Sequence, residues 1–139
     1  MKRSLLHPII LSTLPHFLSI WVVMNHSQNY TGIYMGYCAV IGTSSILSVL
    51  WHRTHESRSA LFWLDYGFAG IWTLYDCLLA AFKTPFILLL VCVLNITTII
   101  LNQLVDYLAK KELLSYEIGH SIWHIFSASK SILVAYIVS

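Results

Sequence analysis

Hydrophobic residues gather into five long blocks along the chain, and short polar segments separate the blocks. The blocks cover about residues 5–24, 32–52, 60–82, 85–106 and 116–138. A helix needs about 20 mostly apolar residues to cross the hydrocarbon layer of a membrane, and each block provides them. The pattern therefore predicts an all-α integral membrane protein, a bundle of about five transmembrane helices in a single domain over residues 1–139.

The composition supports this class and excludes others. Of the 139 residues, 58% are hydrophobic and 10% are charged, whereas soluble domains have roughly 25% charged residues. So few charges cannot cover the surface of a water-soluble globule, and the chain is too apolar to be disordered. The formal net charge of +2 is too small to attract a polyanion, so we expect no nucleic acid partner.

Positive charges are distributed unevenly between the two ends of the predicted bundle. The end that holds the N-terminus carries most of them: Lys2, Arg3, Arg53, Arg58, Lys110 and Lys111. The opposite end carries Lys83. Because Lys and Arg are enriched in cytoplasmic loops, we predict a cytosolic N-terminus. The triplet Asn29-Tyr30-Thr31, which fits the acceptor pattern for N-glycosylation, then lies on the non-cytosolic side.

Polar residues inside the blocks point to a metal site. His120 and His124 are four residues apart, so a helix places both imidazoles on one face, a spacing that suits a shared metal ion. The second block ends at His52 on the side where the last block begins, and Asp65 lies one to two turns inside the third block. All four side chains are therefore predicted at similar depth, with Ser48 one turn before His52 on the same face. Three histidines with an open fourth position are typical of a catalytic zinc site.

The other polar residues of the blocks receive structural interpretations. Asp76 and Lys130 are predicted at nearly the same depth and should form an ion pair, direct or through water; the alternative is that Lys130 extends to the non-cytosolic surface. Asn95 and Asn102 share one face of the fourth block and either join helices or line a cavity. Seven further residues lack a partner at a metal-binding spacing, and we expect them to serve packing: His7, His16, His26, His55, Cys38, Cys77 and Cys92.

The ordered set Ser48-Val-Leu-Trp-His52, Asp65 and His120-Ser-Ile-Trp-His124 resembles the signature of the CREST superfamily of membrane hydrolases. This superfamily includes alkaline ceramidases, progestin/adiponectin receptors and GPI-anchor lipid-remodelling proteins. The resemblance covers the second, third and last blocks. It implies that the three histidines bind Zn²⁺ and that Ser48 and Asp65 hold the water that the metal activates.

The sequence departs from this family in two respects. Family members typically have seven spans, and only one block separates the aspartate block from the last block here. The missing helices normally wall the lipid cavity, and a homodimer could replace that wall. The ceramidases bind calcium through acidic residues before and within their first helix, whereas the first acidic residue here is Glu56. We therefore expect no calcium site.

Three functions are compatible with these patterns. The leading hypothesis is a zinc-dependent intramembrane hydrolase that cleaves an amide or ester bond of a membrane lipid. In it, Asp65 acts as general base and acid, and Ser48 orients the water or donates to the oxyanion. The first alternative is a non-catalytic CREST-like membrane protein with a structural zinc site or a receptor-like role. The second is a small transporter component whose intramembrane histidines and aspartates relay protons.

Overall fold

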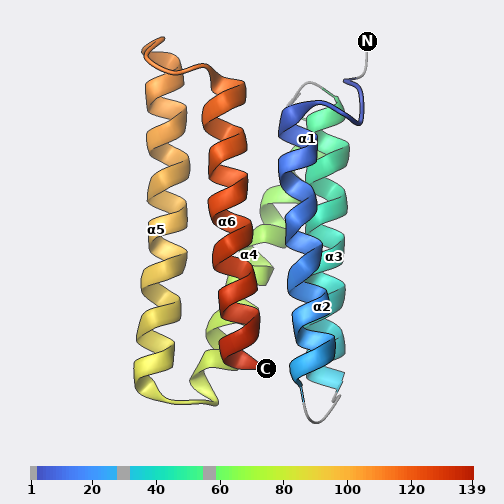
Figure 1. Cartoon of the computed structure of the whole chain (residues 1–139), viewed down its shortest axis with the longest axis vertical. Helices are drawn as coiled ribbons and strands as arrows, with labels where there is room; N and C mark the ends of the chain where they lie inside the picture. The colour runs from blue at the N-terminus through green and yellow to red at the C-terminus, as the bar shows by residue number, and fades with distance from the viewer. Residues whose placement is uncertain (1–2, 28–31, 55–58) are drawn as a thin grey trace.

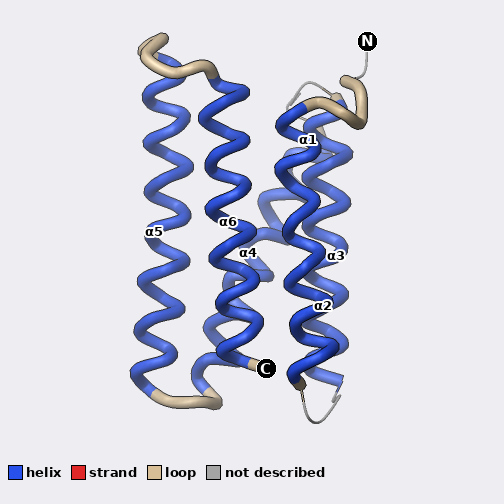
Figure 2. Tube along the Cα trace, in the orientation of Figure 1, coloured by secondary structure: helices blue, strands red, loops and turns tan. Residues whose placement is uncertain are grey.

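Long helices run up and down the main axis of the molecule, and the chain reverses direction between them (Figures 1 and 2). The structure is a computed structural model that describes residues 3–27, 32–54 and 59–139, so Asn29 and His55 lie outside the described residues. The elements are α1 (Pro8–Thr13), the 3-10 turn η1 (Leu14–His16), α2 (Phe17–His26), α3 (Gly32–Arg53), α4 (Ala60–Ala81), α5 (Pro85–Lys110) and α6 (Tyr116–Val138). No strand occurs in these three described ranges, which confirms the predicted all-α class.

Four helical segments of the described chain are long and apolar enough to cross a membrane: Pro8–His26, Gly32–Arg53, Pro85–Lys110 and Tyr116–Val138. The prediction of a multi-pass membrane protein is thereby confirmed. The remaining long helix, α4, has 22 residues but is not among these four, because Asp65, Asp76 and several Trp and Tyr residues lower its mean hydropathy. The prediction of about five spans is therefore confirmed for four of them.

Two boundaries differ from the predicted blocks. The first block is predicted as a single helix, but Pro15 lacks an N–H group and the chain passes through η1, where the N–H of Phe17 bonds to the carbonyls of Leu14 and Pro15. The fourth block was expected to end near residue 106, whereas α5 continues to Lys110. The chain then turns at Glu112, whose φ of 57° is the left-handed conformation common just after a helix.

Polar side chains are buried inside the bundle, and apolar side chains cover its outside. Ser45, Asp76 and His52 are at most 3% exposed, whereas Trp21 and Ile100 are 60% and 61% exposed. A water-soluble protein shows the opposite arrangement, but acyl chains of lipid accept apolar side chains, and intramembrane polar groups face the bundle interior. The distribution is therefore that of a protein surrounded by lipid.

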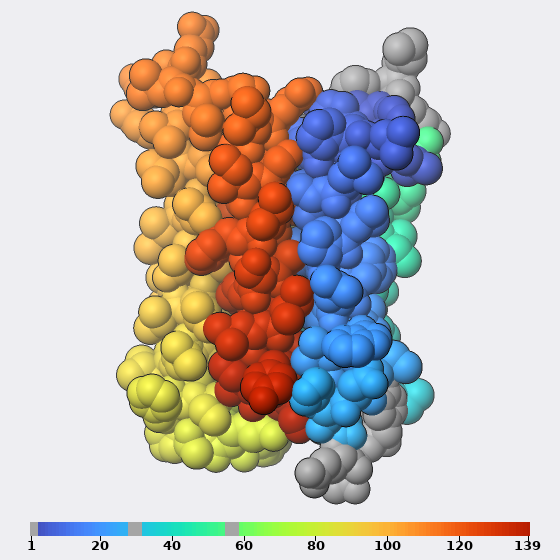
Figure 3. Space-filling view, viewed as in Figure 1, coloured from blue at the N-terminus to red at the C-terminus, as the bar shows by residue number. Residues whose placement is uncertain are grey.

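Helix α6 occupies the middle of the arrangement. It packs against α1, α2, α4 and α5, whereas α3 packs against α1, α2 and α4. Helices α1 and α2, joined by η1, form one continuous rod, called here the α1–α2 rod. Figure 3 shows α6 between α5 on one side and the α1–α2 rod on the other. Because α6 touches most of the bundle, its inward-facing side chains determine what the interior contains.

The segment before α1 joins the end of α3 to the start of α6. The backbone N–H of Arg3 donates to the carbonyl of Arg53 at 3.1 Å. The Arg3 guanidinium lies 3.7 Å from the Glu117 carboxylate, which also lies 3.2 Å from Nε2 of His7. These contacts bring the last turn of α3 and the first turn of α6 to the same end of the molecule.

Candidate metal centre and its cavity

Three histidines from two helices meet inside this end of the bundle. His52 lies in the last turn of α3, and His120 and His124 lie in the first turns of α6. One ligand nitrogen from each ring lies within 4.8 Å of the others. The side chains are 0%, 3% and 3% exposed, respectively. The structure thus brings together the three residues that the sequence predicted as metal ligands.

The cluster is close to the spacing that a shared cation needs. Nε2 of His52 and Nε2 of His124 are 2.9 Å apart, and at this separation two lone pairs repel unless a hydrogen or a cation lies between them. A tetrahedral zinc ion, with Zn–N bonds of about 2.0–2.1 Å, keeps its nitrogens about 3.3 Å apart, so small side-chain shifts would admit it. Imidazole also suits copper, iron and nickel. The cluster could therefore hold a transition-metal ion.

Aromatic side chains enclose the cluster. Tyr116 stacks on His120 with ring centroids 5.0 Å apart, and the Trp51 ring lies 4.9 Å from that of His52. Nδ1 of His124 is buried without a hydrogen-bond partner among the described residues. Metal-binding histidines usually donate through the second nitrogen. Packing, rather than such a hydrogen bond, therefore orients the ring of His124.

A cavity of about 360 Å³ lies beside the cluster, and residues from α3, α4, α5, α6 and the α1–α2 rod line it. Its lining includes His52, His120 and both other predicted site residues, Ser48 and Asp65, but not His124. Asp65 is 8% exposed and makes no hydrogen bond or ion pair within the part of the chain that the structure describes. A carboxylate and a hydroxyl thus face the same cavity as two of the three histidines.

His16 also lines this cavity, although the sequence predicted only a packing role for it. Its Nδ1 lies 2.9 Å from the Thr13 carbonyl, and its Nε2 lies 3.3 Å from Oγ of Ser127. Because a carbonyl only accepts, Nδ1 carries the hydrogen and Nε2 accepts from Ser127 when the ring is neutral. The His16 ring lies 6.0 Å from that of His124. The signal that could have revealed it was Pro15, which interrupts the helix beside the histidine.

Asp76 and Lys130 form the predicted ion pair directly. Nζ of Lys130 donates to Oδ2 of Asp76 at 2.9 Å and to Oδ1 of Asn95 at 2.8 Å, and the Tyr37 hydroxyl donates to Oδ1 of Asp76 at 2.6 Å. Asp76 and Lys130 are 0% and 8% exposed. The prediction is confirmed, and Lys130 does not extend to the surface.

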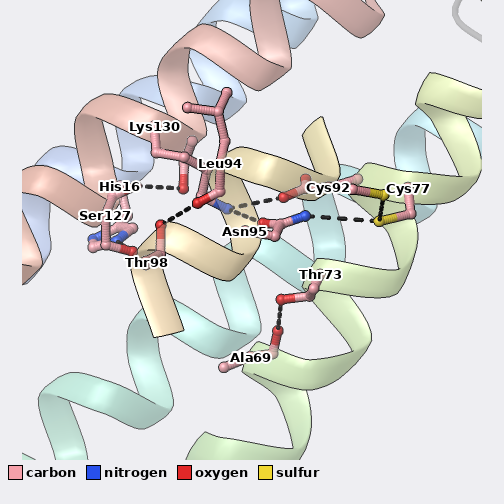
Figure 4. A network of polar contacts seen from close by, with 12 residues as sticks. His16, Ala69, Thr73, Cys77, Cys92, Leu94, Asn95, Thr98, Ser127 and Lys130 are labelled. Atoms are coloured by element: carbon pink, nitrogen blue, oxygen red, sulfur yellow. Dashed lines mark hydrogen bonds and ion pairs between the residues drawn. The ribbon is translucent and has the colours of Figure 1, made fainter. Parts of the chain in front are cut away.

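Asn95 meets both expectations for the polar face of α5. It joins α5 to α6 through Lys130 and also lines the cavity, as does Asn102. Its Nδ2 lies 3.7 Å from Sγ of Cys77, which lies 3.9 Å from Sγ of Cys92 (Figure 4). Polar contacts therefore continue from α6 through α5 to α4.

The fold and the site define a class: a multi-pass membrane protein with a buried three-histidine cluster beside a cavity whose lining includes polar side chains. No protein-family model, curated protein or solved structure matches this chain.

Proposed function

We propose that this protein is a zinc-dependent intramembrane hydrolase that cleaves an amide or ester bond of a membrane lipid. One observation carries the proposal: three buried histidines have ligand nitrogens within 4.8 Å of one another, and two of them, His52 and His120, line a cavity that Asp65 and Ser48 also line. A site that only binds metal has no need of a carboxylate without a protein partner. A hydrolase needs one to move a proton.

The chain's own residues have distinct roles in this proposal. His52, His120 and His124 would hold Zn²⁺, which polarises a carbonyl and makes water a better nucleophile. Asp65 would accept the proton of the attacking water and return it to the leaving amine or alcohol. Ser48, one helical turn from His52, would donate a hydrogen bond to the developing oxyanion.

The proposed setting is the cytosolic half of a membrane. We propose that α4 crosses the bilayer as a fifth span, because it is 22 residues long and packs between α3 and α5. The excess of Lys and Arg at the end where the chain starts supports a cytosolic N-terminus. The apolar outer surface would let a lipid reach the site from the bilayer. The spacing of these residues also supports a relationship to the CREST superfamily.

Metal content and hydrolysis together test the proposal. Detergent-purified wild type should contain about one zinc per chain, and His124→Ala should lose it. His26→Ala is the control, because His26 is exposed and its hydrogen bond and ring contact, to the Val22 carbonyl and the Tyr136 ring, do not involve the cluster. Asp65→Asn should keep the zinc and lose at least about 100-fold in hydrolysis of a ceramide or phospholipid panel. Zinc-loaded wild type that hydrolyses no amide or ester lipid would refute the enzymatic role.

A structural metal is the second candidate, and one observation favours it. The backbones of α3 and α6 do not pack on each other, so an ion held by His52 and His124 would join two helices that otherwise meet only through side chains. His124 also lies outside the cavity lining. In this case, zinc removal should lower the melting temperature, whereas Asp65→Asn should change neither the zinc content nor the melting temperature.

A further inference from the structure

The ammonium group of Lys130 has one N–H donor that no described residue accepts. A lysine ammonium has three N–H donors and no acceptor. Two of them go to Asp76 and Asn95, at 2.9 and 2.8 Å, and Lys130 makes no other hydrogen bond or ion pair within the described ranges. The side chain is 8% exposed and lines the cavity. The third donor is therefore available to a molecule inside the cavity.

The surroundings of Lys130 hold this donor in place. Oδ2 of Asp76 and Oδ1 of Asn95 hold the ammonium on two sides, and the Trp72 ring lies 5.8 Å from Nζ. Figure 4 shows Asn95 on one side of Lys130 and the His16–Ser127 pair on the other. A donor fixed in this way loses little conformational freedom when it binds an acceptor.

The charge of Asp76 determines which acceptor fits. Because the carboxylate already neutralises the ammonium, an anion would bring an unpaired charge into a poorly solvated interior at high cost. A neutral hydroxyl or carbonyl oxygen adds no charge and completes the hydrogen bonding of Lys130. The chemistry therefore favours a neutral oxygen.

The position of Lys130 gives the distance of this oxygen from the metal candidates. Lys130 lies six residues beyond His124 and ten beyond His120 on α6, a rise of about 9–15 Å along the helix. The cavity continues between the two levels, and its mostly apolar lining includes the polar side chains of Ser131, Thr98 and Asn102. Oδ1 of Asn102 is buried without a hydrogen-bond partner in the part of the chain that the structure describes. The hydroxyls of Thr98 and Ser131 already donate to the carbonyls of Leu94 and Ser127, so a plain acyl chain would leave unsatisfied only the Asn102 oxygen and the third donor of Lys130.

We propose that Lys130 forms a second polar subsite, which selects lipids that carry a hydroxyl or keto oxygen on the acyl chain about 9–15 Å from the reacting carbonyl. This inference rests on the proposed function for the identity of the reacting carbonyl. The preference for a mid-chain oxygen rests on Lys130 alone.

Binding of matched amides tests the subsite. The probes are hexadecanamide, a series of its analogues with one hydroxyl on successive carbons through the middle of the chain, and an analogue with a carboxylate there. Wild type should bind one or two hydroxyl analogues about tenfold more tightly than the plain amide and should bind the carboxylate analogue less tightly. Ser129→Ala, on the exposed side of α6, should behave as wild type.

The variant that tests the residue is Asp76→Asn/Lys130→Met, because it removes the donor without leaving a buried charge. It should bind the plain amide as wild type does and lose the tenfold preference. Each titration is repeated on protein treated with a chelator. A preference that survives chelation while hydrolysis is absent refutes the proposed function but supports the subsite. Wild type without a preference, or a double variant that keeps it, overturns the subsite.

Discussion

Replacing Lys130 with methionine should destabilise the protein far more than replacing Lys130 and Asp76 together. Methionine fills a similar volume but leaves the carboxylate of Asp76, which is 0% exposed, without its cation. Removing one partner of a buried ion pair costs about 3–5 kcal/mol, since the other charge stays buried. In Asp76→Asn/Lys130→Met the charge is gone, and the Asn side-chain oxygen can still accept from the Tyr37 hydroxyl. The remaining cost is about 1–2 kcal/mol for the lost partner of Asn95.

Thermal unfolding in one detergent measures this difference. A loss of 3–5 kcal/mol in a chain of this size should lower the melting temperature by on the order of 10 °C, and the double variant should recover more than half of that. Ser129→Ala, an exposed substitution in the same helix, controls for effects that any substitution in α6 would have. If the single and double variants melt at the same temperature, the charges of Asp76 and Lys130 are not coupled, and the buried carboxylate does not depend on its cation.

Three further outcomes follow from individual contacts. Tyr37→Phe should lower the free energy of unfolding by about 1–3 kcal/mol, because it removes a hydrogen bond to a charged group, and the melting temperature should fall. An unchanged melting temperature would mean that the 2.6 Å contact with Asp76 contributes nothing to stability. Gly119→Ala should lower the free energy of unfolding by about 1–3 kcal/mol, because the new Cβ would lie 2.6 Å from a methyl of Leu114. An unchanged melting temperature would show that Leu114 moves aside freely. The sulfur atoms of Cys77 and Cys92 lie 3.9 Å apart, so oxidation with copper phenanthroline should join them in a disulfide. Mass spectrometry of the peptides would detect the disulfide, and Cys92→Ser should abolish it.

Much of the fold could be predicted because it depends on local properties. The apolar blocks at 32–52, 60–82 and 116–138 match α3, α4 and α6 within one residue at each end. The breaks between them are short and polar, and the hydrogen bonds of a membrane helix lie within the helix itself. The blocks with prolines or polar ends were predicted less accurately, since Pro15 interrupts the first rod and α5 continues to Lys110.

The candidate site was predictable where spacing within one helix determines it. His120 and His124 share a face in any helix, and the common depth of His52 follows from the alternating direction of the spans. Together, these two properties predict that the three histidines lie at one depth, and the packing of the helices brings them together. The same properties predict the pairing of Asp76 with Lys130.

Only the tertiary structure decided how the helices turn and pack against one another. It placed His16 beside Ser127, excluded His124 from the cavity lining, and directed two of the three Lys130 donors to Asp76 and Asn95. The physical reason is that the sequence determines distances along a helix through a fixed rise and rotation per residue. Distances between helices depend instead on the packing of side chains that are far apart in the sequence.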